Sequence, residues 1–140
     1  MNRRWTTPTV DAVMTPDPIL LGAEDALETA ARVLEECEIS GAPVVDADGR
    51  LVGVLSDTDL VHARATAGLW ARWPGLRVRH LMHAPVITAD PGMGITEAAE
   101  LMERAKVHRL VVVAPDQQTP VGVLSMSDLV RAMIGERRDG

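Results

Sequence analysis

The sequence contains no phenylalanine and no tyrosine, and it has a single cysteine among its 140 residues. One cysteine, Cys37, excludes an intramolecular disulfide, so the chain is not a small domain held together by disulfide bonds. Tryptophan, at three positions, supplies all the aromatic side chains. Aliphatic residues, alanine and seven methionines must therefore fill the core, which favours aliphatic strands and alanine-rich helices.

Long hydrophobic runs and an excess of basic residues are also absent. The longest apolar runs fall far short of the ~20 residues that a membrane-crossing helix requires. A formal charge of −6, from 14 basic and 20 acidic residues, argues against sequence-independent binding to a phosphate backbone. No signal segment precedes the first repeat, so we expect a cytoplasmic protein that has neither a membrane nor a nucleic acid as its partner.

What the sequence does contain is an internal repeat. Residues 53–61 read Gly-Val-Leu-Ser-Asp-Thr-Asp-Leu-Val, and residues 122–130 read Gly-Val-Leu-Ser-Met-Ser-Asp-Leu-Val, with seven of nine positions identical. Further upstream, Val44-Val45 and Val112-Val113 correspond at nearly the same offset. Two halves of the chain therefore follow one plan.

Each half is predicted to fold in the order strand, helix, strand, strand, helix. In the first half, Asp25 is expected to cap a helix, with Glu28 three residues later and apolar residues at helical spacing from Leu27 to Leu34. A short strand at 19–21 precedes this helix. The second half contains the same apolar positions, from Ile95 to Met102.

A hairpin is predicted after that helix. The aliphatic runs 42–45 and 51–55 flank the turn signal Asp46-Ala47-Asp48-Gly49, and a second helix begins after Ser56. This interpretation divides the chain into a first repeat at 1–66, a connector at 67–77 that carries Trp70 and Trp73, a second repeat at 78–135 and a charged tail at 136–140.

These residues carry a resemblance to a known family. Two units in which Gly-aliphatic-aliphatic-Ser-x-x-Asp follows a hairpin resemble a tandem pair of cystathionine β-synthase (CBS) domains, a Bateman module. Residues 40–46 and 48–59 fit the family pattern. The resemblance implies an α/β (α+β) fold of two βαββα repeats, related by pseudo-two-fold symmetry and packed through their sheets. It also implies homodimers and adenosyl ligands bound between the repeats.

The second repeat is more specific in its resemblance. Residues 105–113 together with 123–128 are similar to the last repeat of the AMP-activated protein kinase γ subunit, in which the matching His, Arg, Ser and Asp contact AMP. The resemblance implies that His108 and Arg109 face a phosphate, Asp128 the ribose, and Ser125 with Ser127 the sugar or phosphate oxygens. The remaining positions expected at a ligand are Thr88 in the second repeat and Ser40, Gly41, Ala42, Ser56, Thr58 and Asp59 in the first.

The duplicated Ser-x-x-Asp motif has two interpretations. An ionised carboxylate can accept hydrogen bonds from both hydroxyls of a ribose diol, and the first helical turn suits an anion. Alternatively, Ser56 and Ser125 are helix N-caps, and Asp59 and Asp128 complete capping boxes. The two uses are compatible.

The two halves differ in the cations and hydroxyls that they offer. The second has Thr88, His108 and Arg109 where the first has Leu21, Ser40 and Gly41. Arginine offers a planar fork of donors to phosphate, although His108 and Arg109 also suit the end of a helix. Threonine in a strand often only satisfies local propensity. We expect one well-equipped site and one weak or apolar site.

Metal binding and catalysis find little support. His80 and His83 could share a helical face, but no Cys, Asp or Glu close by in sequence completes a set of about four ligands. Cys37 is interpreted as a small buried residue, and the motifs of a nucleophile elbow or a glycine-rich phosphate loop are absent from the sequence. We expect no resident metal, no obligatory cofactor and no enzymatic activity.

The sequence therefore predicts a regulatory protein that binds AMP, with ADP or ATP competing and S-adenosylmethionine or NAD as alternatives. Because the chain ends with the second repeat, we expect it to act in trans on a separate, unidentified protein. The rival hypothesis is a ligand-free dimerisation scaffold that uses its alanine-rich helices and the connector around Trp70 and Trp73 as contact surface. A third reading has the arginine-rich connector bind an anionic macromolecule.

Overall fold

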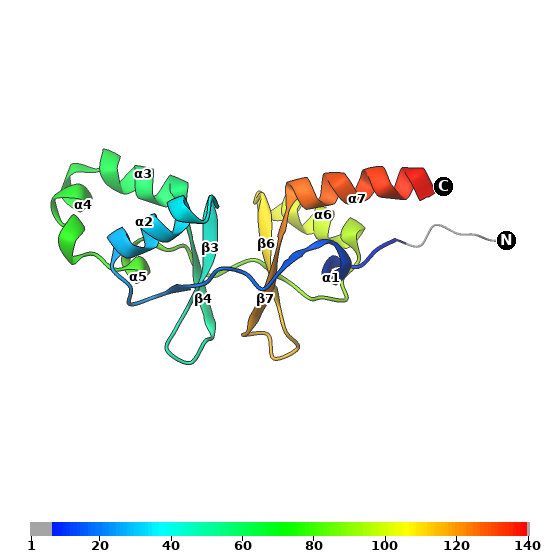
Figure 1. Cartoon of the computed structure of the whole chain (residues 1–140), viewed down its shortest axis with the longest axis horizontal. Coiled ribbons are helices and arrows are strands. Elements are labelled where there is room, and N and C mark those ends of the chain that lie inside the picture. The colour runs from blue at the N-terminus through cyan, green and yellow to red at the C-terminus, as the bar shows by residue number, and fades with distance from the viewer. Residues whose placement is uncertain (1–6, 140) are drawn as a thin grey trace. The chain divides into compact units, whose positions relative to one another are not determined.

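The computed structural model describes the backbone of residues 7–139 and the side chains of residues 7–135, and it divides into two compact units. One unit runs from Ile19 to Val86. The other combines the segment up to Pro18 with residues Ile87–Gly140. The predicted class is confirmed, because each unit contains its own sheet and its own helices (Figure 1).

The Ile19–Val86 unit contains a three-stranded sheet in the order β2-β3-β4, with β2 parallel to β3 and β3 antiparallel to β4. Its elements are β2 (Leu21–Gly22), α2 (Leu27–Glu36), β3 (Gly41–Val45), β4 (Leu51–Ser56), α3 (Asp57–Ala65), α4 (Ala67–Ala71), the 3-10 turn η1 (Trp73–Gly75) and α5 (Val78–Leu81). The helix and strands follow in the predicted order.

The hairpin between β3 and β4 is closed by the side chain of Asp46. Its carboxylate accepts hydrogen bonds from the backbone N–H groups of Asp48 and Arg50, at 2.9 and 3.0 Å. Gly49 has a φ of 81°, a left-handed conformation that glycine adopts without steric cost. The turn predicted at 46–49 is therefore confirmed.

Helix α2 buries its predicted apolar stripe but does not begin where expected. Leu27, Ala30 and Leu34 are buried in the core of the unit, whereas the N-cap is Ala26 and makes no side-chain hydrogen bond. The prediction of Asp25 as the N-cap is wrong, because its carboxylate instead accepts the backbone N–H of Gly22 at 2.8 Å. The free N–H of Leu27 is satisfied by the distant Leu76 carbonyl.

The connector packs on this same unit. Trp73 lies against the apolar cluster that contains Leu76, and Trp70 stacks at a tilt on Trp73 with a centroid distance of 5.1 Å. The guanidinium of Arg64 lies 4.7 Å from the Trp70 ring centroid, within range of a cation–π contact. Trp73 therefore belongs to the fold of the Ile19–Val86 unit, whereas Trp70 stays 40% exposed.

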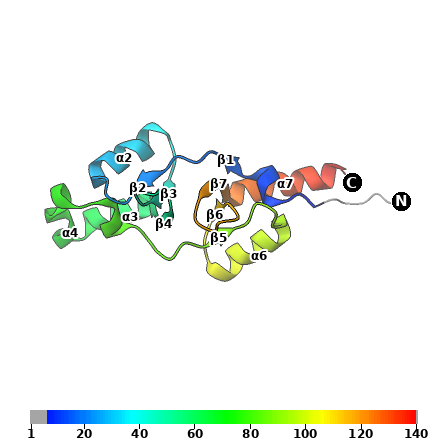
Figure 2. The same ribbon diagram turned by 90° about the horizontal axis from the view of Figure 1, so that it is seen from below.

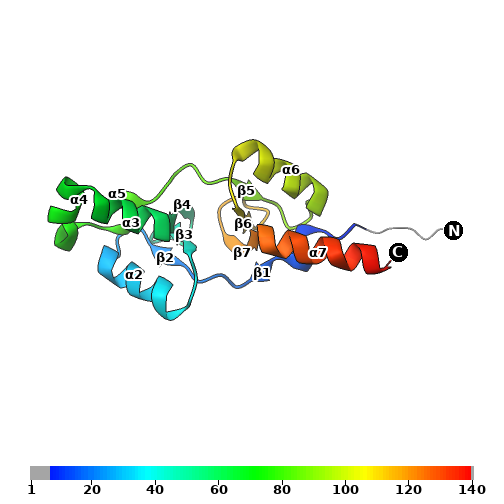
Figure 3. The same ribbon diagram turned by 90° about the horizontal axis from the view of Figure 1, so that it is seen from above.

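The second unit contains a four-stranded sheet in the order β1-β7-β6-β5. Its elements are α1 (Val10–Val13), β1 (Thr15–Pro16), β5 (Thr88–Ala89), α6 (Ile95–Ala105), β6 (Arg109–Val113), β7 (Pro120–Ser125) and α7 (Met126–Asp139). Helices α6 and α7 lie side by side and pack on one face of this sheet, as Figures 2 and 3 show. The stretch expected as a tail, 136–139, continues α7.

The N-terminal segment joins the unit of the second repeat. Val10 is fully buried in the cluster that contains Leu124, and its N–H donates to the Met93 carbonyl at 2.7 Å. Strand β1 pairs antiparallel with β7, which places Pro16 opposite Gly122. In the other unit, residue His83 forms the corresponding bridge with Val54 on β4. Each sheet is thus flanked by the segment that precedes the other repeat's first strand.

Cys37 does not have the position expected of it. It is the C-cap residue of α2 and is exposed, so the prediction of a buried cysteine is wrong. The buried apolar stripe of α2 ends at Leu34, and the helix itself ends at Glu36. Cys37 follows the helix, so it is not part of the face that the helix buries.

Two equivalent positions test the electrostatics of the helix C-termini. Glu38 after α2 and Lys106 after α6 both have left-handed backbones, with φ values of 54° and 59°. Carbonyl groups at a helix C-terminus favour a cation, so Glu38→Lys is expected to raise the free energy of unfolding by about 0.5 kcal/mol. The matched change Lys106→Glu should lower it by a similar amount. Urea denaturation measures both, and shifts in the same direction would contradict the explanation.

Candidate functional site

The Ser-x-x-Asp motif of the first repeat forms a capping box at the start of α3. The Ser56 backbone N–H and hydroxyl donate to Asp59 Oδ2 at 2.8 and 3.0 Å, and the Asp59 N–H approaches Ser56 Oγ at 3.4 Å. The other carboxylate oxygen, Oδ1, lies 2.9 Å from Nδ1 of His83. Asp59 is 7% exposed. Its carboxylate is therefore held by the cap on one side and by a histidine on the other.

The second repeat reproduces the cap with a different outer partner. The Ser125 N–H donates to Asp128 Oδ2 at 2.8 Å, and the Asp128 N–H donates to Ser125 Oγ at 3.2 Å. Asp128 is 8% exposed, and its Oδ1 accepts a hydrogen bond from Arg131 Nη2 at 2.7 Å. The capping interpretation of both aspartates is thus supported by their contacts, and a further role would have to coexist with it.

The start of β6 brings the predicted cations beside this cap. In the β6–β7 pair, Arg109 is opposite Ser125, and the Met126 N–H donates to the His108 carbonyl at 3.0 Å. His108 is exposed and Arg109 is half-buried. Residues separated by about 17 positions in the sequence therefore meet at the N-terminus of α7, where the helix dipole favours an anion.

Thr88 lies farther along the sheet. It is half-buried on β5, paired with Val111 in the middle of β6 rather than with Arg109 at its start. Ser127 is exposed in the first turn of α7, one residue before Asp128. Both belong to the same unit as His108 and Arg109, and their contact with a ligand stays a prediction.

The corresponding place in the first repeat has the same backbone pairing, but different side chains stand there. Gly41 is opposite Ser56, and the Asp57 N–H donates to the Ser40 carbonyl at 2.8 Å. Thr58 and Ser40 are exposed. The side chain of Ala42 is buried in the core, so any contact from that residue would come from its backbone.

Beside Ser40, the surface is hollowed and acidic. An open hollow of about 440 Å³ has Ser40, Asp57, Glu35 and Glu38 among its lining residues, with aliphatic residues of α2 between them. Asp59 does not line it. At the equivalent place of the other unit, Glu38 is replaced by Lys106 and Ser40 by His108. Glu103 retains the negative charge of Glu35, so the first repeat is the more acidic of the two at this place, which disfavours phosphate there.

Sequence reasoning missed two residues, His83 and Arg131. His83 reaches Asp59 because residue 83 pairs with β4, a contact between residues far apart in the sequence that no local pattern signals. Arg131 stands three residues after Asp128 on one helix, a spacing that brings side chains together, so this contact was open to prediction.

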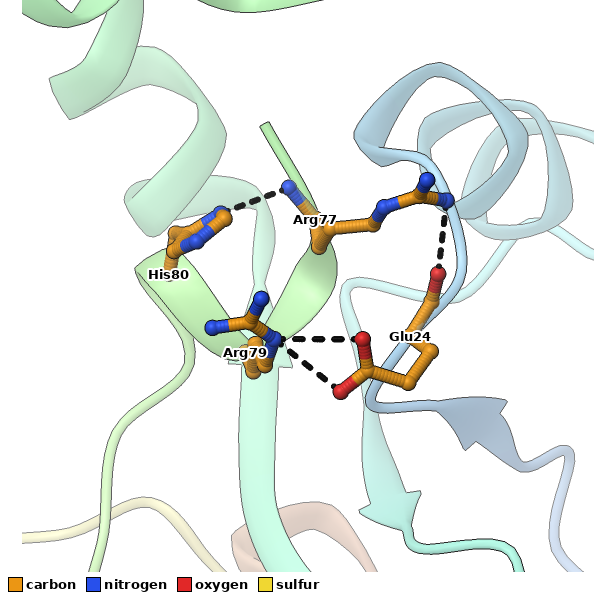
Figure 4. Close-up of polar contacts among 4 residues, drawn as sticks. All are labelled: Glu24, Arg77, Arg79 and His80. Atoms are coloured by element: carbon orange, nitrogen blue, oxygen red, sulfur yellow. Dashed lines mark hydrogen bonds and ion pairs between the residues drawn. The ribbon is translucent and has the colours of Figure 1, made fainter. Parts of the chain in front are cut away.

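His80 and His83, for which the sequence gave little support as a metal-binding pair, have separate partners. His80 Nδ1 accepts the Arg77 N–H at 2.8 Å at the start of α5, whereas His83 faces Asp59. Figure 4 shows His80 in a polar cluster in which Arg77 donates to the Glu24 carbonyl and Arg79 lies 3.0 Å from the Glu24 carboxylate. Among the described residues, no group of three or more His, Cys, Asp or Glu side chains is arranged to hold a metal ion.

Comparison with known proteins identifies the family. The family model for the CBS domain matches the chain twice, at residues 10–66 and 78–135. The chain belongs to the CBS domain family and contains a tandem pair, as the resemblance implied. Within the described part of the chain, no helix is both long and apolar enough to cross a membrane.

Individual relatives share this organisation. Protein MJ1426 of Methanocaldococcus jannaschii is 30% identical over 84% of this chain and 86% of its own length. The crystal structure of CBSX2 from Arabidopsis thaliana in complex with AMP is 28% identical, with a TM-score of 0.81 over 93% of this chain and 98% of that one. The human 5′-AMP-activated protein kinase subunit gamma-3 is 31% identical over 76% of this chain.

Some relatives are much longer proteins. The chain spans 22% of the gamma-3 subunit, and it spans 22–23% of several inosine-5′-monophosphate dehydrogenases that it matches. Similarity to these proteins therefore concerns a part of each of them.

Proposed function

We propose that this protein is a regulatory CBS pair that binds an adenine nucleotide, AMP above ADP or ATP, and controls a separate protein. The observation that carries the proposal is that His108 and Arg109, at the start of β6, lie beside the Ser125–Asp128 cap that follows the end of β7. Those groups combine a buried carboxylate for the ribose diol with cations and the positive end of the α7 dipole for a phosphate.

The comparisons support the class of ligand. CBSX2, which is similar over nearly its whole length, has been crystallised with AMP, and the gamma-3 subunit belongs to a kinase activated by AMP. The acidic hollow beside Ser40 argues that a phosphate prefers the second repeat. We therefore propose one strong nucleotide site, in the second repeat, and a weak site in the first.

A thermal-shift panel of AMP, ADP, ATP, S-adenosylmethionine and NAD tests the proposal. A ligand that binds only the folded chain stabilises it by ~2.7 kcal/mol at a hundredfold excess over its dissociation constant. AMP is expected to give the largest rise in melting temperature. If none of the five ligands raises it at millimolar concentration, the proposed function is wrong.

A ligand-free dimerisation scaffold is the second candidate, and an exposed apolar stripe on α7 favours it. Met126, Val130, Met133 and Ile134 recur on one helical face and are 42–54% exposed. In this case two copies of the chain associate through α7 irrespective of nucleotide. Sedimentation with and without AMP separates the candidates, because a scaffold gives the same association in both and binds no nucleotide saturably.

A further inference from the structure

Asp128 has two oxygens with unlike partners. Oδ2 is held by the backbone N–H of Ser125, and this contact belongs to the helix cap. Oδ1 is held by the guanidinium of Arg131 at 2.7 Å. The Arg131 side chain is 68% exposed, whereas that of Asp128 is 9% exposed. The buried carboxylate is thus covered by a long cation that extends into solvent.

The first repeat shows that a cap of this kind does not need such an arginine. The residue equivalent to Arg131 is His62, and the outer oxygen of Asp59 is met by His83 from another segment instead. In the unit that contains the second repeat, the position of His83 is taken by Thr15, which pairs with β7 as His83 pairs with β4. The capping geometry is nevertheless nearly the same in both units, with an N–H to Oδ2 distance of 2.8 Å in each. The outer oxygen of each aspartate thus meets a basic side chain, a histidine from another segment in the first repeat and an arginine of the same helix in the second.

We propose that Arg131 determines specificity at this site by selecting phosphorylated nucleosides over neutral ones. The inference rests on the proposed nucleotide function. In the absence of ligand, Arg131 occupies Asp128, so a ribose diol must displace it. A neutral nucleoside offers the displaced guanidinium no new acceptor. A nucleotide brings a phosphate, for which the planar fork of arginine is a well-matched donor.

The exposure of the two partners fits this exchange. The largely exposed guanidinium can leave Asp128 for water or a phosphate at small cost, whereas the buried carboxylate keeps the Ser125 N–H and gains the ribose hydroxyls in place of the arginine. Among the residues whose side chains are described, Asp128 contacts the guanidinium of Arg131, and no second contact fixes it in place. The side chain can therefore swing from the carboxylate to a phosphate bound nearby.

The test compares AMP with adenosine by isothermal titration of the whole chain and of the Arg131→Ala variant. The wild-type protein is expected to prefer AMP. In Arg131→Ala, adenosine should bind as well as before or better, while AMP binding weakens by about tenfold, so the preference falls at least tenfold. Arg131→Lys should restore part of the preference. His62→Ala, at the matched position of the first repeat, should leave it unchanged.

The outcomes separate this inference from the proposed function. If Arg131→Ala weakens AMP and adenosine equally, the arginine only supports Asp128, and the inference is overturned. An unchanged preference also overturns it while leaving nucleotide binding in place. If the wild-type chain binds neither ligand, the proposed function fails first and this inference falls with it. Circular dichroism without ligand establishes that each variant is folded.

Discussion

Valine in place of Gly122 is expected to lower the free energy of unfolding by about 3 kcal/mol, the upper end of what overpacking a core costs. A Cβ at this position would collide with Met14 Sδ and lie 3.0 Å from the backbone oxygen of Thr15. The methionine tip could move, but the Thr15 oxygen belongs to β1, which pairs with β7. Relief would require β1 to leave the sheet. Urea denaturation measures the loss.

Two controls make this prediction specific. Gly75 has no atom within 4 Å of the place where its Cβ would lie, so Gly75→Val should change stability by only about 0.5 kcal/mol. A double-mutant cycle between Met14→Ala and Gly122→Ala tests the contact directly. Removing the Met14 side chain should recover part of the cost at Gly122. Strictly additive effects would show that Met14 does not pack there.

The same close contact in the other repeat explains a feature of the sequence pattern. A Cβ at Gly53 would lie 2.6 Å from Met82 Sδ, so Gly53 with Met82 and Gly122 with Met14 are equivalent pairs. The internal repeat places Gly53 opposite Gly122 in the alignment of the two halves, together with the strands around them. The sequence did not indicate that each methionine packs on the sheet of the other repeat. Which sheet the short segment after each methionine joins is decided by pairing between residues far apart in the chain.

Elements with strong local signals were predictable, and elements held by distant contacts were not. The hairpin turn at Asp46 and Gly49 and the buried stripe of α2 follow from spacing and turn chemistry alone. The start of α2 does not follow from local signals. The Leu27 N–H, which a local cap would otherwise satisfy, donates to the carbonyl of Leu76, 49 residues away. An error of one residue at a helix end is the result.

The candidate site divides in the same way. The sequence offered capping boxes as one of two interpretations of the duplicated motif, and the family resemblance implied that His108, Arg109 and Ser125 face one ligand. The pairing of β6 with β7 places Arg109 opposite Ser125. The sequence did not predict the contact between His83 and Asp59, which depends on the pairing of residue 83 with β4. Arg131 was visible at helical spacing, but its importance follows from the burial of Asp128.

Removal of the Asp128 carboxylate is expected to have two separable effects. Without ligand, Asp128→Ala loses the cap contact to the Ser125 N–H and should cost about 1 kcal/mol of stability. With AMP at a hundredfold excess, it should also lose the ~2.7 kcal/mol that binding supplies. The difference from the wild-type chain under those conditions is then about 4 kcal/mol, measured as denaturation midpoints with and without AMP.

Asp128→Asn and Asp59→Ala distinguish the ligand role from the cap. An asparagine carbonyl can still accept the Ser125 N–H, but its amide group replaces one of the two acceptors that a ribose diol needs. Asp128→Asn should therefore remain close to wild-type stability and lose most of the AMP effect. Asp59→Ala breaks the matching cap of the first repeat, so it should cost about 1 kcal/mol while keeping the AMP effect. Retention of the AMP effect in Asp128→Asn, or its equal loss in Asp59→Ala, would reduce Asp128 to a helix cap.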